Sequence, residues 1–270
     1  MSRCPHGPSV RMGSASGHAG CRRLSGLALL LAAALALAPF AATRAESQTC
    51  VILLHGLGRT PLSMLPLKFA LDRAGYRTVN QGYPSLAHPV EELSGRYVAR
   101  ALEKCASAPD APVHFVAHSL GGILVRHYLQ EHEVADGSRM VMLGPPNNGS
   151  ELIDEFADDA WFTVMGPAAL QLGTAPGSLP ANLAPVDIEI GIIAGTRTGL
   201  DSMILQAASM PEPNDGKVSL QSARLDEMKD FLVVDKTHTF IPTDPNISEQ
   251  VIAFLQDGRF RPVDDAGLNE

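Results

Sequence analysis

The sequence predicts an α/β fold in which a mostly parallel sheet of about six strands carries helices on both faces. Short apolar runs alternate with helix-length segments through most of the 270 residues. Glycine or proline closes several of these runs, as at 56–58 and 144–146. Neighbouring parallel strands need a crossover connection, and the helix-length segments supply it. The composition, with 45% hydrophobic and 19% charged residues, suits one globular domain.

The predicted strands are 51–55, 76–82, 113–117, 139–143, 188–194 and 231–234, most of which are short apolar runs. The segments with helical spacing are 62–74, 89–106, 123–132 and 247–256. One extended irregular segment, 149–185, has helical pieces near 151–157 and 168–172 and is then rich in Gly, Ala, Pro and Ser. We expect this segment to form either a small cap or a plain surface excursion.

The first 45 residues differ in kind from the rest. They contain five arginines and no acidic residue, and an apolar run at 24–38 is followed by small residues at 41–45. This pattern predicts a secretory signal peptide, with export to the periplasm or the medium and a mature domain over 46–270. Cleavage is expected before Glu46, with Ala42 as an alternative site. An uncleaved membrane anchor over 24–42 is the competing interpretation, although Pro39 within it argues against a span.

Charge narrows the range of partners. Removal of the leader leaves 16 basic side chains against 29 acidic ones, a formal net charge of −13. Such a chain repels nucleic acid and has no polybasic patch for an anionic membrane, so small neutral or apolar molecules are the expected partners. The same removal leaves two cysteines, Cys50 and Cys105. In an exported protein they are expected to form a disulfide, at the edge of the sheet away from residues 118–122.

A strand, a tight turn and a helix are predicted in VHFVAHSLGG, residues 113–122. Ser119 lies at the apex of the turn, where the backbone is strained and the hydroxyl projects beyond the carboxyl edge of the sheet. Ala117 and Gly121, two residues before and after it, leave room for so sharp a turn. The plainer interpretation is that Ser119 only caps the following helix.

This stretch resembles the nucleophile elbow of the α/β-hydrolases, and among them of bacterial lipases and esterases, with AxSxG where GxSxG is usual. The resemblance implies a serine, an acid and a histidine in that chain order, each after a strand. Asp215 lies in PNDGKV, which is similar to the NDGxV turn that carries the acid in bacterial lipases, and Asp201 is the alternative. His238 is the only histidine after Asp215.

The resemblance also assigns the donors that would bind an oxyanion. They are the backbone amides of Leu120, directly after the serine, and of Leu57, in a sequence similar to the HGxG loop of lipases. His55 and His118 are expected to orient this loop or to pack beside the elbow rather than to react. His114, His127 and His132 are expected to be structural or solvent-facing.

The likeness covers nearly all of residues 50–257. It implies an enzyme that cleaves carboxylic esters of small molecules or lipids through an acyl-enzyme, with no metal and no organic cofactor. An acyltransferase would use the same acyl-enzyme, and a noncatalytic lipid-binding or chaperone role is a third alternative. Acyl chain length, the alcohol portion and oligomeric state are not predicted.

Overall fold

The computed structural model describes residues 48–106, 108, 110–199 and 210–262. Six strands form one sheet in the order β2-β1-β3-β4-β5-β6, and every neighbouring pair is parallel. The strands are β1 (Cys50–Leu54), β2 (Arg77–Gln81), β3 (Val113–His118), β4 (Arg139–Leu143), β5 (Glu189–Gly195) and β6 (Asp230–Val234). The predicted fold class is therefore confirmed.

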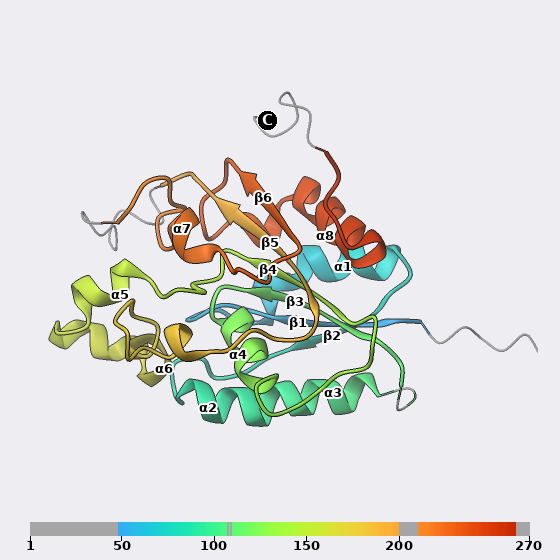
Figure 1. Cartoon of the computed structure of the whole chain (residues 1–270), viewed down its shortest axis with the longest axis horizontal. Coiled ribbons are helices and arrows are strands. Elements are labelled where there is room, and N and C mark those ends of the chain that lie inside the picture. The colour runs from blue at the N-terminus through green and yellow to red at the C-terminus, as the bar shows by residue number, and fades with distance from the viewer. Residues whose placement is uncertain (1–47, 107, 109, 200–209, 263–270) are drawn as a thin grey trace, which may run out of the picture. The chain divides into compact units, whose positions relative to one another are not determined.

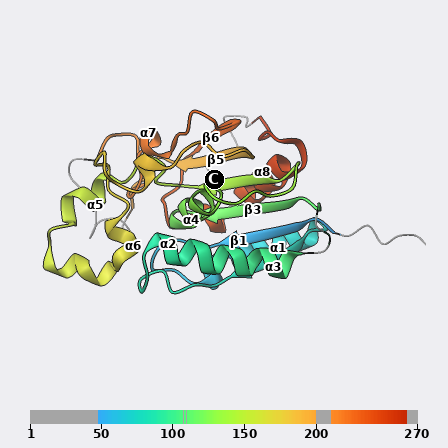
Figure 2. The same ribbon diagram turned by 60° about the horizontal axis from the view of Figure 1, so that its bottom comes forward.

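Helices cover both faces of this sheet, as Figures 1 and 2 show. One face packs against α2 (Val90–Leu93), the π-helical turn η2 (Ser94–Val98), α3 (Ala99–Cys105) and α4 (Leu120–Tyr128). The other face packs against α1 (Leu65–Arg73) and α8 (Pro245–Asp257). Two further single turns, η1 (Pro61–Met64) and η5 (Ile241–Thr243), lead into α1 and α8.

The side chains of the central strands divide between the two faces. In β1, Ile52 and Leu54 belong to the cluster under α2–α4, whereas Val51 and Leu53 belong to the cluster under α1 and α8. Successive side chains of a strand point to opposite faces, so a strand buried on both sides reads as a continuous apolar run. The apolar runs of the sequence are explained by this double cover.

Two helices begin earlier than the sequence predicted. The helix after the elbow starts at Leu120 rather than 123, because Gly121 allows its first turn to lie against β1. A Cβ at Gly121 would come within 2.8 Å of the Leu54 carbonyl oxygen. The last helix starts at Pro245, since the Asp244 carboxylate caps it by accepting the amides of residues 246 and 247.

The segment 149–185 folds as a chain of short helices at one end of the sheet, beside α2 (Figures 1 and 2). They are α5 (Glu151–Phe156), η3 (Ala160–Met165), α6 (Pro167–Leu170) and η4 (Pro180–Asn182). Gln171 fastens this insert to α2, because its Oε1 accepts the Val90 amide at 2.7 Å and its Nε2 donates to Glu91. Between β5 and β6 lies one more short helix, α7 (Leu220–Ala223).

A disulfide joins Cys50 at the start of β1 to Cys105 at the end of α3, with Cα atoms 5.7 Å apart. Since Cys50 begins its strand, the bridge lies at the amino edge of the sheet, and the loop that holds Ser119 lies at the carboxyl edge. Among the described residues, no helix has the length and apolar character needed to span a bilayer.

Candidate active site

Ser119 lies in the turn between β3 and α4 with a φ of 54° and a ψ of −123°. It is the one non-glycine residue with a positive φ in the described part of the chain. Its own amide donates to the Leu143 carbonyl oxygen at 2.9 Å, and its carbonyl accepts the Gly122 amide. Such a conformation costs energy in a non-glycine residue and persists only where the surrounding structure enforces it. The strained turn predicted from the sequence is thus present.

Asp215 and His238 form a buried pair. The imidazole Nδ1 donates to Asp215 Oδ2 at 2.8 Å. Asp215 Oδ1 accepts the backbone amides of Lys217 and Val218 at 3.0 and 2.8 Å, so both carboxylate oxygens are engaged. The carboxylate therefore has a fixed orientation, and it holds the histidine in the tautomer whose Nε2 is free to accept a proton.

The backbone of His238 is held at both of its polar groups. Its amide donates to the Asp215 carbonyl oxygen at 3.0 Å, and its carbonyl accepts the Nε2 proton of His118 at 3.0 Å. Burial lowers the pKa of His118 well below its ordinary value, and the nearby charges of Lys217 and Arg59 lower the pKa further. His118 is consequently neutral and anchors the loop of His238.

Glycines let these loops approach one another closely. A Cβ at Gly144, which has a φ of 54°, would come within 3.0 Å of Asp215 Oδ2 and 3.1 Å of His238 Nδ1. A Cβ at Gly56 would come within 3.2 Å of the Ser119 Cβ. A side chain at either position would therefore press on the groups of the site, and at Gly144 the positive φ would add strain.

The loop after β1 has its own anchors. The Tyr83 hydroxyl donates to the carbonyl of His55, and the two rings stack with centroids 4.1 Å apart. His55 Nδ1 donates to the Gly56 carbonyl oxygen at 2.9 Å, and the Ser85 hydroxyl accepts the amide of Gly58 at 2.9 Å. Burial lowers the pKa of His55, which keeps the ring neutral. His55 thus orients the loop.

The amides of Leu57 and Leu120 have no acceptor within the described residues. Leu120 is the first residue of α4, where an amide has no partner inside the helix. Leu57 lines the same pocket as Ser119. Two amides without acceptors beside the Ser119 hydroxyl have the chemistry that an oxyanion hole would need.

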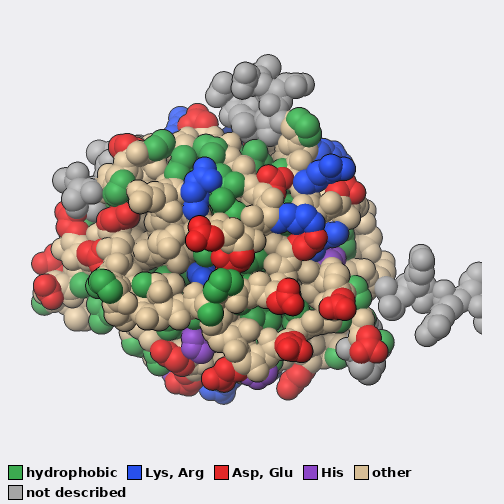
Figure 3. All heavy atoms as spheres, in the orientation of Figure 1, with side chains coloured by type: hydrophobic (Ala, Val, Ile, Leu, Met, Phe, Trp, Pro, Cys, Tyr) green, Lys and Arg blue, Asp and Glu red, His purple; other side chains and the backbone are tan. Residues whose placement is uncertain are grey.

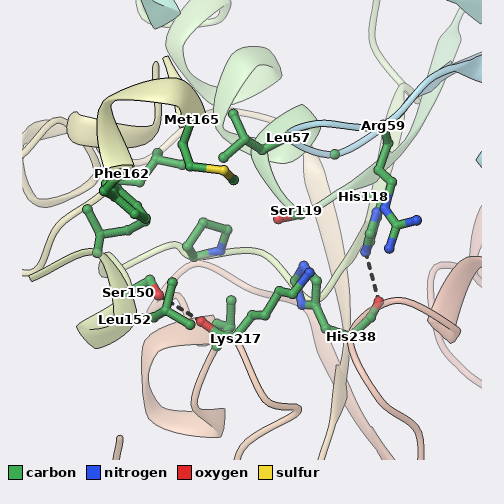
Figure 4. A pocket seen from close by; sticks show the side chains of 15 residues that line it. Leu57, Arg59, His118, Ser119, Ser150, Leu152, Phe162, Met165, Lys217 and His238 are labelled. Carbon is green, nitrogen blue, oxygen red and sulfur yellow. Dashed lines mark hydrogen bonds between the residues drawn. The ribbon is translucent and has the colours of Figure 1, made fainter. Parts of the chain in front are cut away.

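Ser119 and His238 line one pocket, which Figure 4 shows from close by. Pro146 and Ser150, from the loop after β4, contribute to its wall. The insert supplies most of its apolar side chains, namely Leu152, Ile153, Phe162, Met165 and Leu172. The segment 149–185 therefore shapes the pocket rather than only extending the surface.

The structure brings together Ser119, Asp215, His238 and the loop of Leu57, which the sequence places up to 181 residues apart (Leu57 to His238). Asp201, the alternative acid, lies outside the described residues. Sequence reasoning missed the anchoring roles of Tyr83 and Ser85, and it missed two cations of the pocket wall, Arg59 and Lys217. The two cations adjoin motifs that were found, and that adjacency was the available signal.

Comparison with known proteins identifies the class. Residues 51–266 match the alpha/beta hydrolase family, and the chain belongs to that family. By sequence, no curated protein matches the chain.

Solved structures share the fold at low identity. The mature form of the Bacillus licheniformis lipase BlEst2 is 18% identical with a TM-score of 0.61, over 78% of this chain and 92% of the lipase. A metagenomic carboxyl esterase is 17% identical with a TM-score of 0.52, over 79% and 77%. Lipase B of Aspergillus fumigatus is 14% identical with a TM-score of 0.52, over 82% of this chain and 55% of that one.

Proposed function

We propose that the protein is a serine hydrolase that cleaves carboxylic esters. The observation that carries the proposal is the buried Asp215–His238 pair, whose imidazole lines one pocket with the strained Ser119. A hydroxyl, an imidazole and a carboxylate are the groups that activate a serine for acyl transfer. Membership of the hydrolase family and the fold shared with lipases and an esterase agree with this chemistry.

In the proposed mechanism, the Ser119 Oγ attacks the ester carbonyl carbon while its proton passes to His238 Nε2. The amides of Leu57 and Leu120 bind the oxyanion that forms on the former carbonyl oxygen. When the C–O bond to the alcohol breaks, the imidazolium returns its proton to the departing alkoxide. Water then attacks the acyl-enzyme with His238 as the base, which releases the acid and restores Ser119.

The function is tested with p-nitrophenyl esters of graded acyl length. Turnover by the wild-type protein and none by Ser119→Ala is the expected result, and the chain-length profile separates an esterase from a lipase. The cavity volume is about 80 Å³, so short to medium acyl chains are expected to be preferred. Formation of a new ester with an added alcohol would establish acyl transfer. If the protein shows neither turnover nor labelling by a fluorophosphonate, the noncatalytic lipid-binding or chaperone role is the remaining alternative.

We further propose that the protein is exported and loses residues 1–45. The basic, apolar and small-residue order of that segment supports this, and so does the disulfide, since disulfides persist in oxidising compartments. N-terminal sequencing of the protein recovered outside the cytoplasm should begin at Glu46. Recovery of the intact leader in the membrane fraction would contradict cleavage.

A further inference from the structure

Two cations line the pocket that holds Ser119. Arg59 follows the loop after β1, and Lys217 follows the turn of Asp215, so they come from segments 158 residues apart. Both are partly buried. Their charges reach the interior of the site, because both depress the pKa of His118.

The partner of Arg59 is neutral. Its Nη2 donates to the Thr239 hydroxyl at 2.8 Å, which leaves further guanidinium N–H donors. Among the described residues that line the pocket, none is acidic.

The outside of the molecule has the opposite charge. Acidic side chains are frequent on the face in Figure 3, notably at the end that carries α5. That helix and the turn after it contain Glu151, Asp154, Glu155, Asp158 and Asp159. An acidic exterior repels anions at long range, so it does not account for two cations beside the nucleophile.

The pocket has an apolar side and a polar, positively charged side. In Figure 4, Phe162 and Met165 lie on one side of Ser119, whereas Arg59 and His118 lie on the other. The Lys217 side chain extends along the wall toward His238. An ester bound with its carbonyl at Ser119 would place one substituent among apolar side chains and the other near the cations.

We propose that Arg59 and Lys217 form a subsite for an anionic group on the substrate, a carboxylate or a phosphate. The preferred ester then has an apolar part on one side of the scissile bond and an anion on the other. A guanidinium binds either anion through two N–H donors, and a lysine adds a point charge. This inference rests on the proposed ester hydrolysis and names its class of substrate.

The test compares esters matched in length that differ in one charge. 4-Nitrophenyl hydrogen glutarate is paired with its neutral methyl ester, and the corresponding phosphonate monoester distinguishes a phosphate-like anion from a carboxylate. 4-Carboxyphenyl butanoate, paired with its methyl ester, places the anion on the alcohol side instead. The quantity measured is the ratio of kcat/KM for each anionic ester to that for its neutral partner.

The wild-type protein should favour an anionic member of at least one pair, and Arg59→Gln with Lys217→Gln should lower that ratio about tenfold or more. Lys68→Gln with Arg100→Gln removes the same charge from positions outside the pocket and should keep the ratio. In the wild-type protein, the ratio should also fall as salt is raised from about 20 mM to about 500 mM, because the charges become screened.

A wild-type protein that favours no anionic ester, or a pocket variant that keeps the preference, would overturn the subsite while ester hydrolysis stands. Absence of turnover for every ester, neutral ones included, would overturn the proposed function and the subsite with it.

Discussion

His114 and His118 lie at opposite ends of the same strand, β3, and the two ends of the sheet serve different purposes. At the amino edge, His114 Nδ1 accepts the Arg139 amide at 3.0 Å, near the disulfide between Cys50 and Cys105. At the carboxyl edge, His118 supports the loop of His238 beside a strained serine. Both histidines are buried with lowered pKa values, so burial alone does not mark a reacting group.

Backbone strain lies at the carboxyl edge of the sheet, and cross-links lie at the amino edge. The carboxyl edge has the positive φ of Ser119 and the close approach at Gly144. The amino edge has a covalent bridge, together with the ion pairs that Glu189 makes with Arg139 and Lys229. Changes at the carboxyl edge should therefore act on catalysis, and changes at the amino edge should act on stability.

The largest effect is expected for Ser119→Ala. Loss of the nucleophile should lower kcat by roughly a millionfold, as for a serine that forms the acyl-enzyme. The thermal midpoint should hardly move, because alanine adds no atoms to the turn. Initial rates on a p-nitrophenyl ester measure the loss of kcat, and a melting curve measures the thermal midpoint. Turnover retained by this variant would move the nucleophile elsewhere.

Asp215→Asn should lower kcat by about ten-thousandfold, because an amide in this place favours the wrong imidazole tautomer. The melt should change little, since the Asn Oδ1 can still accept the amides of Lys217 and Val218. Asp201→Asn is the matched control and should keep near wild-type rates. If Asp201→Asn is the damaging change and Asp215→Asn is not, the acid is misassigned.

Removal of the disulfide tests the other edge. The bridge joins residues 55 positions apart. By lowering the entropy of the unfolded chain, it should add about 4 kcal/mol to the free energy of unfolding. Cys50→Ser with Cys105→Ser should lower the urea midpoint accordingly and leave kcat/KM of the folded enzyme near wild type. Two titratable thiols in the denatured, unreduced wild-type protein would contradict the bridge.

The smallest effect concerns pH. Burial, followed by the charge of Arg139, lowers the pKa of His114 to about 4. The unfolded state binds this proton near pH 6.5 and the folded state does not, so the free energy of unfolding falls as pH falls from about 6.5 to about 4. Between these pH values, His114 makes the free energy of unfolding depend on pH with a slope of up to about 1.4 kcal/mol per pH unit. The variant His114→Gln should lack this contribution. An unchanged slope in urea titrations would contradict this assignment.

Much of the fold was predictable because the four central strands, β1, β3, β4 and β5, are buried on both faces. The strand 139–143 was placed to the residue, and the others were placed within one residue at each end. Helix starts were less predictable, since the start of α4 depends on how Gly121 packs against β1. The helix predicted over 62–74 is divided into η1 and α1, with Pro66 in the first turn of α1, where a missing amide is tolerated.

The parts of the site that a short sequence motif forms were predictable. Local sequence indicates the turn of Ser119 and the turn of Asp215, because each is made by neighbouring residues. The lining by Phe162 and Met165 was not predictable, since their places depend on how the insert folds back over the sheet. Nor was the convergence of Arg59 with Lys217, which results from packing between two distant loops.

The most direct measurement locates the reactive serine chemically. The wild-type protein is treated with a fluorophosphonate, digested and mapped by mass spectrometry, beside Ser119→Ala as the control. The phosphonyl adduct should lie on Ser119 and should be absent from the variant. An adduct on another residue, or none on an ester-hydrolysing protein, would contradict the account.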